Sequence, residues 1–309
     1  MAPQKEIMSS RAKLLKLATY SSVGVALLLI IIKAVVWFMS GSVSILASLI
    51  DSMMDAGASV LNLLAVRLAL QPADHEHRFG HGKAEGIAAL FQAAFIMGSA
   101  LFLLLNAIDR IRHPSELHIT PVVFAVMLAS LVITIALVAF QQWILKQAHS
   151  SAVAADRLHY LTDILSNIAV LIALSVSLYG WHQADAIIGI GLALWIGWSA
   201  IGIGREALNM LMDRALPDAD ILRIKTAVNH TPGVLGVHDL RTRLSGETRI
   251  IQCHIELHQD LPLHQAHDIA VAAEHNIAAL FEDSEIIIHL DPQNVVNTHI
   301  TTHTQGCNS

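Results

Sequence analysis

Long apolar runs fill the first two thirds of the chain, and a more polar part follows them. Each run has about 20 residues or more, the length that an α-helix needs to cross the hydrocarbon core of a bilayer. Most connections are short, but a longer polar link, QPADHEHRFGHGK, follows the second run. The pattern predicts a membrane all-α transmembrane domain of six helices, at residues 17–39, 43–70, 85–111, 121–145, 153–179 and 184–212.

The pattern changes after about residue 213, where short apolar segments alternate with polar residues and indicate a small folded domain. Two segments have apolar residues at helical spacing, and three alternate or run apolar as strands do. Their order predicts an α-β-β-α-β domain, an open-faced α+β sandwich of metallochaperone-like type. We therefore expect a cytoplasmic N-terminal segment, a transmembrane domain, a folded cytoplasmic domain and a disordered tail, at residues 1–16, 17–212, 213–292 and 293–309.

Lys and Arg residues predict the orientation of the spans. They collect before the first span, in the second link and beside the ends of the fourth and sixth spans, so both termini should be cytoplasmic. Arg110 and Arg112 lie on the opposite side and are outnumbered. The N-terminal segment lacks a short apolar run with a small-residue cleavage site, so we expect the first span to act as an uncleaved insertion signal.

Composition agrees with a membrane protein. The chain is 54% hydrophobic and 14% charged, with a mean hydropathy of +0.55, whereas soluble domains carry about 25% charged residues. The net charge of -6 argues against nucleic acid as a partner. Cys253 and Cys307 both fall in the part assigned to the cytoplasm, so we expect no disulfide.

Four ionisable residues interrupt the apolar pattern of the second and fifth spans. Asp51 and Asp55 are four residues apart, as are His159 and Asp163, so each pair shares a helix face. Each such group costs about 2.5–3.5 kcal/mol near the bilayer centre on insertion scales. Structural polar contacts between helices are the alternative, but two carboxylates on one face repel each other without a cation. Three carboxylates and an imidazole predict a four-coordinate divalent metal site.

Three other polar residues in the spans change this picture less. Asn62 and Asn167 continue the polar faces of the same two helices, and we expect them to line a water-filled approach to the site. Lys33 in the first span is not assigned to the site, because a lysine can snorkel toward the membrane surface.

A second group of candidate ligands lies in the polar link after the second span. Asp74, His77 and His81 can close on one metal ion, with His75 and Glu76 as bystanders. The alternative is a solvated loop that is rich in histidine. A metal bound here would be held weakly, because no regular structure fixes the backbone.

The third group is dispersed over the polar C-terminal part. His289 and Asp291 are two residues apart on a predicted strand and point to the same side. Strand residues of such a domain can converge on one edge, where they would hold one or two metal ions. The candidate ligands are His238, His254, His264, His267, His289 and Asp291.

Further histidines are weaker candidates. We expect His258 to be an ordinary surface residue. The tail contains His299, His303 and Cys307, whose spacing allows only weak chelation in a flexible segment.

Together these residues resemble the cation diffusion facilitator family, specifically its bacterial zinc and ferrous-iron efflux transporters. The similarity covers residues 14–292 and rests on the motifs SLIDSMMD, PADHEHRFGHGKAE, DRLHYLTD, VHDLRTRLSG and IIIHLDP. It implies a homodimer in the bacterial inner membrane that exports divalent metal from the cytoplasm in exchange for protons. It also implies that the protein is not an enzyme.

The resemblance assigns roles to individual residues. It implies a transport site at Asp51, Asp55, His159 and Asp163, and a loop site at Asp74, His77 and His81. It implies a binuclear site in the cytoplasmic domain, with Asp291 placed to bridge two metals, at His238, His254, His267, His289 and Asp291.

Two further positions stand out in this comparison. Lys83 and Asp213 match an ion pair that ties the transmembrane domains of two protomers together. Leu290 is a departure, because family members often have a polar residue there, and an outer hydrogen bond to the site could be missing.

The expected cargo is Zn²⁺, with Cd²⁺ and Fe²⁺ as further candidates, because the transport ligands are nitrogen and oxygen atoms. Protons would compete for the same ligands and release the metal. The cytoplasmic sites would use Zn²⁺ either to regulate transport or to stabilise the dimer.

Other functions fit the sequence less well. A passive divalent-metal channel or uniporter is the nearest alternative, but a channel needs weaker sites. An intramembrane aspartyl protease would need one Asp on each of two facing helices, and a metal-sensing receptor would need an output domain that is not visible.

Overall fold

The structure is a computed structural model that describes residues 2–41, 43–112, 121–177, 184–246, 248–281 and 283–293. The chain divides into two compact units, Met1–Leu211 and Met212–Ser309. The tail residues proposed as weak ligands, His299, His303 and Cys307, lie outside the described part of the chain.

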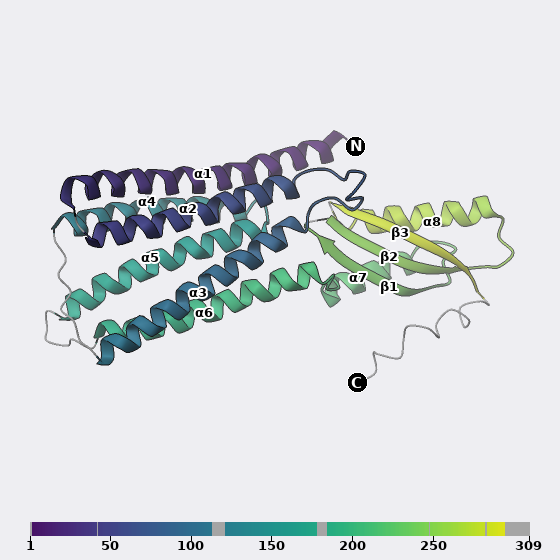
Figure 1. Cartoon of the computed structure of the whole chain (residues 1–309). Helices are drawn as coiled ribbons and strands as arrows, with labels where there is room; N and C mark the ends of the chain where they lie inside the picture. The colour runs from purple at the N-terminus through teal and green to yellow at the C-terminus, as the bar shows by residue number, and fades with distance from the viewer. Residues whose placement is uncertain are drawn as a thin grey trace. The chain divides into compact units, whose positions relative to one another are not determined.

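The first unit consists of long helices that run alongside one another (Figure 1). At 1.5 Å per residue, the shortest of them, with 25 residues, still exceeds a hydrocarbon core of about 30 Å. The helices are α1 (Ala2–Ser40), α2 (Val43–Ala69), α3 (Ala84–Arg112), α4 (Pro121–Leu145), α5 (Ser151–Ser177) and α6 (Ala184–Leu211).

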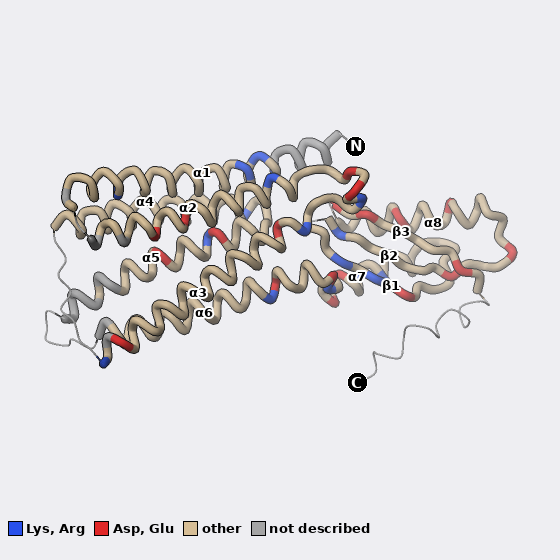
Figure 2. The backbone as a smooth tube through the Cα atoms, in the orientation of Figure 1, with Lys and Arg blue, Asp and Glu red and all other residues tan. Residues whose placement is uncertain are grey.

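Within the part of the chain that the structure describes, five of these helices are long and apolar enough to cross a membrane. Helix α5 has 27 residues and contains the ionisable residues Asp156, Arg157, His159 and Asp163. Figure 2 shows acidic positions inside α2 and α5, where most of the other residues are uncharged.

The first helix is longer than the predicted span. It begins at Ala2, so the segment assigned to the cytoplasm continues the helix. Residues 4–16 contain good helix formers, including Lys, Arg, Glu, Ala and Leu, and no glycine or proline. Pro3 lies in the first turn, where a proline costs the helix no hydrogen bond.

Small residues let α3 and α6 approach closely. Four alanines on α6 recur every seven residues and are buried, at Ala186, Ala193, Ala200 and Ala207. A Cβ atom at Gly189 of α6 would lie 3.2 Å from the Cβ atom of Ala107 on α3. Close packing of small side chains is the usual means by which membrane helices associate, because lipid provides no hydrophobic driving force between them.

The second unit is a three-stranded sheet with two helices. The strands pair in the order β1-β2-β3, with β1 antiparallel and β3 parallel to β2. Helix α8 makes the crossover that a parallel pair requires. The elements are α7 (Asp218–Asn229), β1 (Gly236–Ser245), β2 (Thr248–Leu257), α8 (Leu263–Ala278) and β3 (Ser284–Pro292). The predicted α-β-β-α-β order is confirmed.

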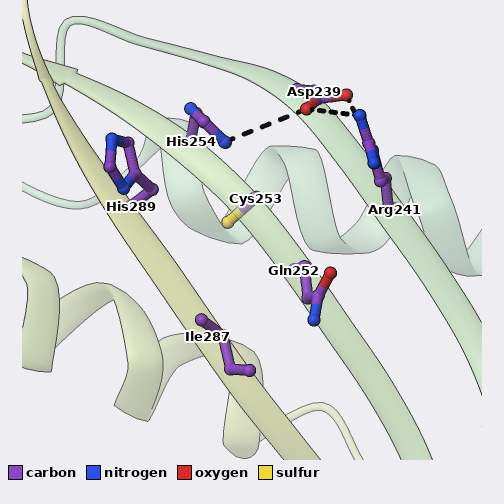
Figure 3. A pocket seen from close by; sticks show the side chains of 7 residues that line it. All are labelled: Asp239, Arg241, Gln252, Cys253, His254, Ile287 and His289. Carbon is purple, nitrogen blue, oxygen red and sulfur yellow. Dashed lines mark hydrogen bonds and ion pairs between the residues drawn. The ribbon is translucent and has the colours of Figure 1, made fainter.

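The two faces of this sheet differ. On β2, Ile251, Cys253 and Ile255 are buried in the core together with Ile224 of α7 and Ile277 of α8. The alternate residues of β2 point to the other face, which the helices do not cover (Figure 3). The strand register therefore places polar residues of all three strands on one open face.

Candidate metal sites

The first candidate site lies between α2 and α5. The Nε2 atom of His159 is 3.0 Å from Oδ1 of Asp55 on α2 and 4.0 Å from Oδ2 of Asp163, one turn along α5. One ligand atom from each of the three lies within 4.8 Å of the other two, close enough to bind one metal ion. Asp55 and His159 are 104 residues apart in the sequence, so the packing of α2 against α5 brings them together.

The fourth predicted ligand, Asp51, is not part of this group. Its side chain lies one turn before Asp55 on α2 and is exposed. A tetrahedral ion held by Asp55, His159 and Asp163 would need one more ligand, either a water molecule or a reoriented Asp51 carboxylate.

The imidazole of His159 is held in place by its surroundings. It is buried, and the ring of Phe95 from α3 packs against it edge-on, with ring centroids 5.6 Å apart. An imidazole fixed on one side by an aromatic ring and on the other by a carboxylate keeps its coordinating nitrogen directed at the site.

A buried polar network lies one helical turn away and was not identified from the sequence. Asp156 of α5 is fully buried and accepts hydrogen bonds from Ser22 Oγ of α1 at 2.7 Å and from Gln141 Nε2 of α4 at 2.8 Å. Ser59 of α2 lies 3.4 Å from Asp156 and 2.8 Å from the Tyr160 hydroxyl. The network joins four helices beside the first candidate site, and its only sequence signal was an Asp in an apolar run.

Lys33, which the sequence does not assign to the site because a lysine can snorkel, is buried against α2. Its side chain is only 7% exposed. Its Nζ donates hydrogen bonds to Ser52 Oγ at 2.7 Å and to the carbonyl oxygen of Ser48 at 3.1 Å, both on α2. The lysine therefore turns toward α2 because that helix offers two acceptors where the lipid offers none.

The two asparagines lie in different surroundings. Asn62 is buried in a largely apolar groove of about 980 Å³ whose lining comes from α2 and α3. Asn167 donates a hydrogen bond to the carbonyl oxygen of Asp163 in its own helix, at 2.8 Å. A shared water-filled approach lined by both residues remains a prediction.

The loop between α2 and α3 brings its three predicted ligands together. Asp74 lies 3.5 Å from His77 Nδ1 and 3.3 Å from His81 Nε2, and the two imidazole rings are 4.6 Å apart. Hydrogen bonds from the backbone N–H groups of His77 and Glu76 hold the pKa of Asp74 below its usual range. The carboxylate is therefore ionised at neutral pH and can bind a cation. His75 contacts Arg78 instead.

The third candidate site lies on the open face of the sheet. Asp291 of β3 is at its centre, with Oδ2 at 3.1 Å from His238 Nε2 and 2.8 Å from His254 Nδ1, and Oδ1 at 3.3 Å from His289 Nε2. The register explains this grouping, because His238 pairs with His254 and His254 pairs with His289. Both carboxylate oxygens thus have a histidine neighbour, as a bridging ligand would.

The charge state of Asp291 suits a metal ligand. Partial burial raises its pKa, but the hydrogen bond with His254 and the charges of His289 and His238 outweigh that effect. The pKa is lowered overall, so the carboxylate stays ionised in mildly acidic solution.

Two acidic residues beside this site were missed in the sequence. Glu256 Oε1 lies 3.3 Å from His238 Nδ1, and Asp239 Oδ2 lies 3.8 Å from His254 Nε2. Asp239 has a positive φ of 45° at an irregularity in the β1–β2 register. Figure 3 shows Asp239 and His254 facing each other across a pocket of about 360 Å³ that His289 also lines. Strand register and a bulge, neither visible in the sequence, place them there.

Several predicted members do not join this group. The side chains of His264 and His267 at the start of α8 are exposed, and neither belongs to the cluster around Asp291. His258 is exposed near Asp260. Leu290 packs against the hydrophobic core, on the opposite face from its two neighbours, so an apolar residue at this position fits the domain.

The proposed ion pair of Lys83 with Asp213 concerns two protomers and remains a prediction. Within its own unit, Lys83 donates to the carbonyl oxygen of Leu211 at 3.4 Å. Asp213 accepts a hydrogen bond from Arg243 at 3.2 Å within the second unit.

Comparison with known proteins matches both units to one protein family. Residues 19–212 match the model of the cation efflux transmembrane domain, and residues 216–293 match that of the cation efflux protein cytoplasmic domain. The chain is 50% identical over 287 residues to the cation-efflux pump FieF of Klebsiella pneumoniae, covering 93% of this chain and 96% of the relative.

Further relatives agree with this match. The FieF pump of Salmonella arizonae is 49% identical over 288 residues, with 93% of this chain and 96% of that protein covered. Among solved structures, a nickel form of the MamM C-terminal domain aligns with 26% identity and a TM-score of 0.24, covering 25% of this chain and 99% of that one.

Proposed function

Because the chain belongs to the cation efflux family, a family of multi-pass membrane transporters of divalent cations, we propose that it is a proton-coupled antiporter that exports Zn²⁺ from the cytoplasm. The family makes it a transporter and not an enzyme. One observation supports the proposed mechanism above all: Asp55, His159 and Asp163 converge between two membrane helices at metal-binding distances.

The ligand atoms favour Zn²⁺ as the cargo. One imidazole nitrogen with carboxylate oxygens suits a tetrahedral Zn²⁺ ion, and Cd²⁺ has similar preferences. Fe²⁺ also accepts nitrogen and oxygen ligands, and it is the second candidate among physiological metals. A site composed only of carboxylates would have favoured Mg²⁺ or Mn²⁺ instead.

The same ligands can couple metal export to proton entry. Zn²⁺ binds from the cytoplasm while the carboxylates are ionised and His159 is neutral. Movement of the helices then exposes the site to the opposite side, where protons bind His159 and the carboxylates and displace the metal. The helices then move back, the protonated site opens to the cytoplasm again, and it loses its protons there. No separate proton path is required.

The other two sites act on this cycle from the aqueous side. We assign the group around Asp291 to a cytoplasmic domain that dimerises. The protein would lie in the bacterial inner membrane, with both termini of the chain in the cytoplasm. Its His and Asp ligands suit Zn²⁺, which would either regulate transport or stabilise the dimer. The exposed site at Asp74 binds metal more weakly, because the loop backbone is not fixed by regular structure.

Replacement of Asp55 by alanine tests this function. The variant removes the α2 ligand that contacts His159, so Zn²⁺ uptake into vesicles containing the purified protein should fall to the background rate. Asp260→Ala removes an exposed carboxylate far from the membrane helices in sequence and should transport normally. Normal uptake by a folded Asp55→Ala protein would contradict the proposal.

A further inference from the structure

A buried lysine in α1 has no part in the mechanism above. The side chain of Lys33 is 7% exposed, although the helix around it is apolar and a lysine stem is long enough to carry its charge elsewhere. Its ammonium group instead donates to Ser52 Oγ and to the carbonyl oxygen of Ser48. Figure 1 shows α1 running beside α2 along this stretch. An intramembrane cation held in this way is more often functional than incidental.

The position of this cation relates it to the transport site. Ser52 directly follows Asp51, and Ser48 lies one turn earlier on the same helix. The carboxylates of Asp51, Asp55 and Asp163 all lie within electrostatic range of the Lys33 ammonium group. The hydrogen bonds to Ser48 and Ser52 therefore hold a positive charge beside the carboxylates without making it a ligand.

Counting charges shows what this cation contributes. Three ionised carboxylates carry a charge of -3, and a divalent metal with a neutral imidazole leaves -1. The ammonium group of Lys33 brings the loaded site to zero. A net charge inside a bilayer is costly, so a balanced loaded site is easier to move through a conformational change.

The same charge also limits how tightly metal binds. A cation beside the carboxylates repels a second cation that binds them. A transporter gains from this effect, because a site that holds its ion too strongly cannot release it.

We propose that Lys33 is a fixed counter-cation of the transport site, which offsets the carboxylates when the site is empty and weakens metal binding enough for release. This role rests on the proposed function of Asp55, His159 and Asp163. Lys33 acts through the electrostatic field of the site and not by contact with the metal. The competing explanation is purely structural: the lysine joins α1 to α2 through Ser52, and its charge is irrelevant.

Three substitutions of Lys33 separate charge from hydrogen bonding. Lys33→Met removes both, Lys33→Gln keeps a donor for Ser52 without the charge, and Lys33→Arg keeps both. Each is made in the full-length protein with Asp74→Ala and Asp291→Ala, which disable the other two candidate sites. Zn²⁺ affinity is measured at pH 8, where protons compete least.

A counter-cation predicts the same result for both neutral variants. Lys33→Met and Lys33→Gln should bind Zn²⁺ about tenfold more tightly, a change that a nearby unit charge readily produces in a protein. Both should also transport with a lower KM and a lower maximal rate, because release becomes slow. Lys33→Arg, which keeps the charge, should behave as the parent protein.

The outcomes against the proposal are distinct. Wild-type behaviour of Lys33→Gln together with weaker binding by Lys33→Met would show a structural contact and overturn the role of the charge. Unchanged or weaker binding by both neutral variants would overturn it as well. Asp55→Ala is measured beside them: if it still binds Zn²⁺ normally, the transport site and the role of Lys33 both fail, whereas loss of binding confines any failure to Lys33.

Discussion

The ionisable side chains of Lys33, Asp156 and His159 in the first unit are buried, and each contacts a polar group of another helix. Burying such groups without partners would cost several kcal/mol each. The polar partners offset this cost only when the helices pack in this arrangement. These residues therefore favour this arrangement of the helices over others. In the second unit, Cys253 is also buried, and burial favours the neutral form of its thiol.

Cys253 should be chemically inert in the native protein. Burial raises the pKa of its thiol to about 11, so almost no reactive thiolate is present at pH 8. In a Cys307→Ser variant, iodoacetamide at pH 8 should leave Cys253 unmodified until the protein is denatured, as intact-mass spectrometry would show. Modification in the native state at the rate of free cysteine would mean that this strand opens to solvent.

At the scale of elements, two kinds of contact hold the membrane helices together. The network around Asp156 joins α1, α2, α4 and α5 through hydrogen bonds. The pair of α3 and α6 relies on small residues, with Gly189 set against Ala107. The first kind responds to loss of a polar atom and the second to added volume, so different substitutions test them.

Loss of the Asp156 carboxylate should loosen the four-helix network. Asp156→Ala removes the carboxylate to which both Ser22 and Gln141 donate, which should cost about 1–3 kcal/mol in total. Ser22 Oγ can still donate to the carbonyl oxygen of Ala18, and Gln141 Nε2 can still donate to Ser22 Oγ. The melting temperature of the detergent-solubilised protein should fall by several degrees. Thr134→Ala is the matched control, because that buried hydroxyl bonds only to its own helix. Equal melting temperatures for the two variants would show that the network adds no stability.

Added volume should disturb the contact of α3 with α6 at one glycine and not at another. Gly189→Leu introduces a side chain whose Cβ atom would lie only 3.2 Å from the Cβ atom of Ala107, so it should cost about 1–3 kcal/mol through overpacking. Gly191→Leu, on the same helix, adds the same side chain where no atom lies within 4 Å. Thermal stability of the two variants should therefore differ, and a larger loss in Gly191→Leu would argue against this packing.

At the scale of the whole molecule, the three candidate metal sites belong to different parts of the chain, and only one of them lies within the membrane helices. The site around Asp291 lies in the second unit, which has its own hydrophobic core. Under the proposed function, this site either regulates transport or stabilises the dimer.

Asp291→Ala distinguishes these roles. The substitution removes the carboxylate that His238, His254 and His289 share, so metal binding by the second unit should be lost. If the site regulates, the Zn²⁺ concentration needed for half-maximal transport rises while the dimer persists on size-exclusion chromatography. A dimer that dissociates in the variant, with unchanged transport by the protein that remains assembled, would favour the structural role.

Regular spacing made part of this arrangement predictable. Four-residue intervals placed His159 beside Asp163, and strand alternation placed His289 beside Asp291. The environments of Lys33 and Asp156 could not be predicted in this way, because their partners Ser52 and Ser22 lie 19 and 134 residues away. Glu256 and Asp239 depend on strand register and a bulge. Contacts within an element follow from its period, whereas contacts between elements require the fold.

Zn²⁺ flux into vesicles of the purified protein, with and without an imposed pH gradient, tests the central claim most directly. A proton-coupled exporter should show Zn²⁺ flux that the pH gradient accelerates and that exceeds the flux of Mn²⁺ and Fe²⁺. The pH gradient should dissipate as the metal moves. Flux that is indifferent to the gradient would identify a channel or uniporter, and proton competition at His159 and its carboxylate neighbours would then be excluded as the driving step.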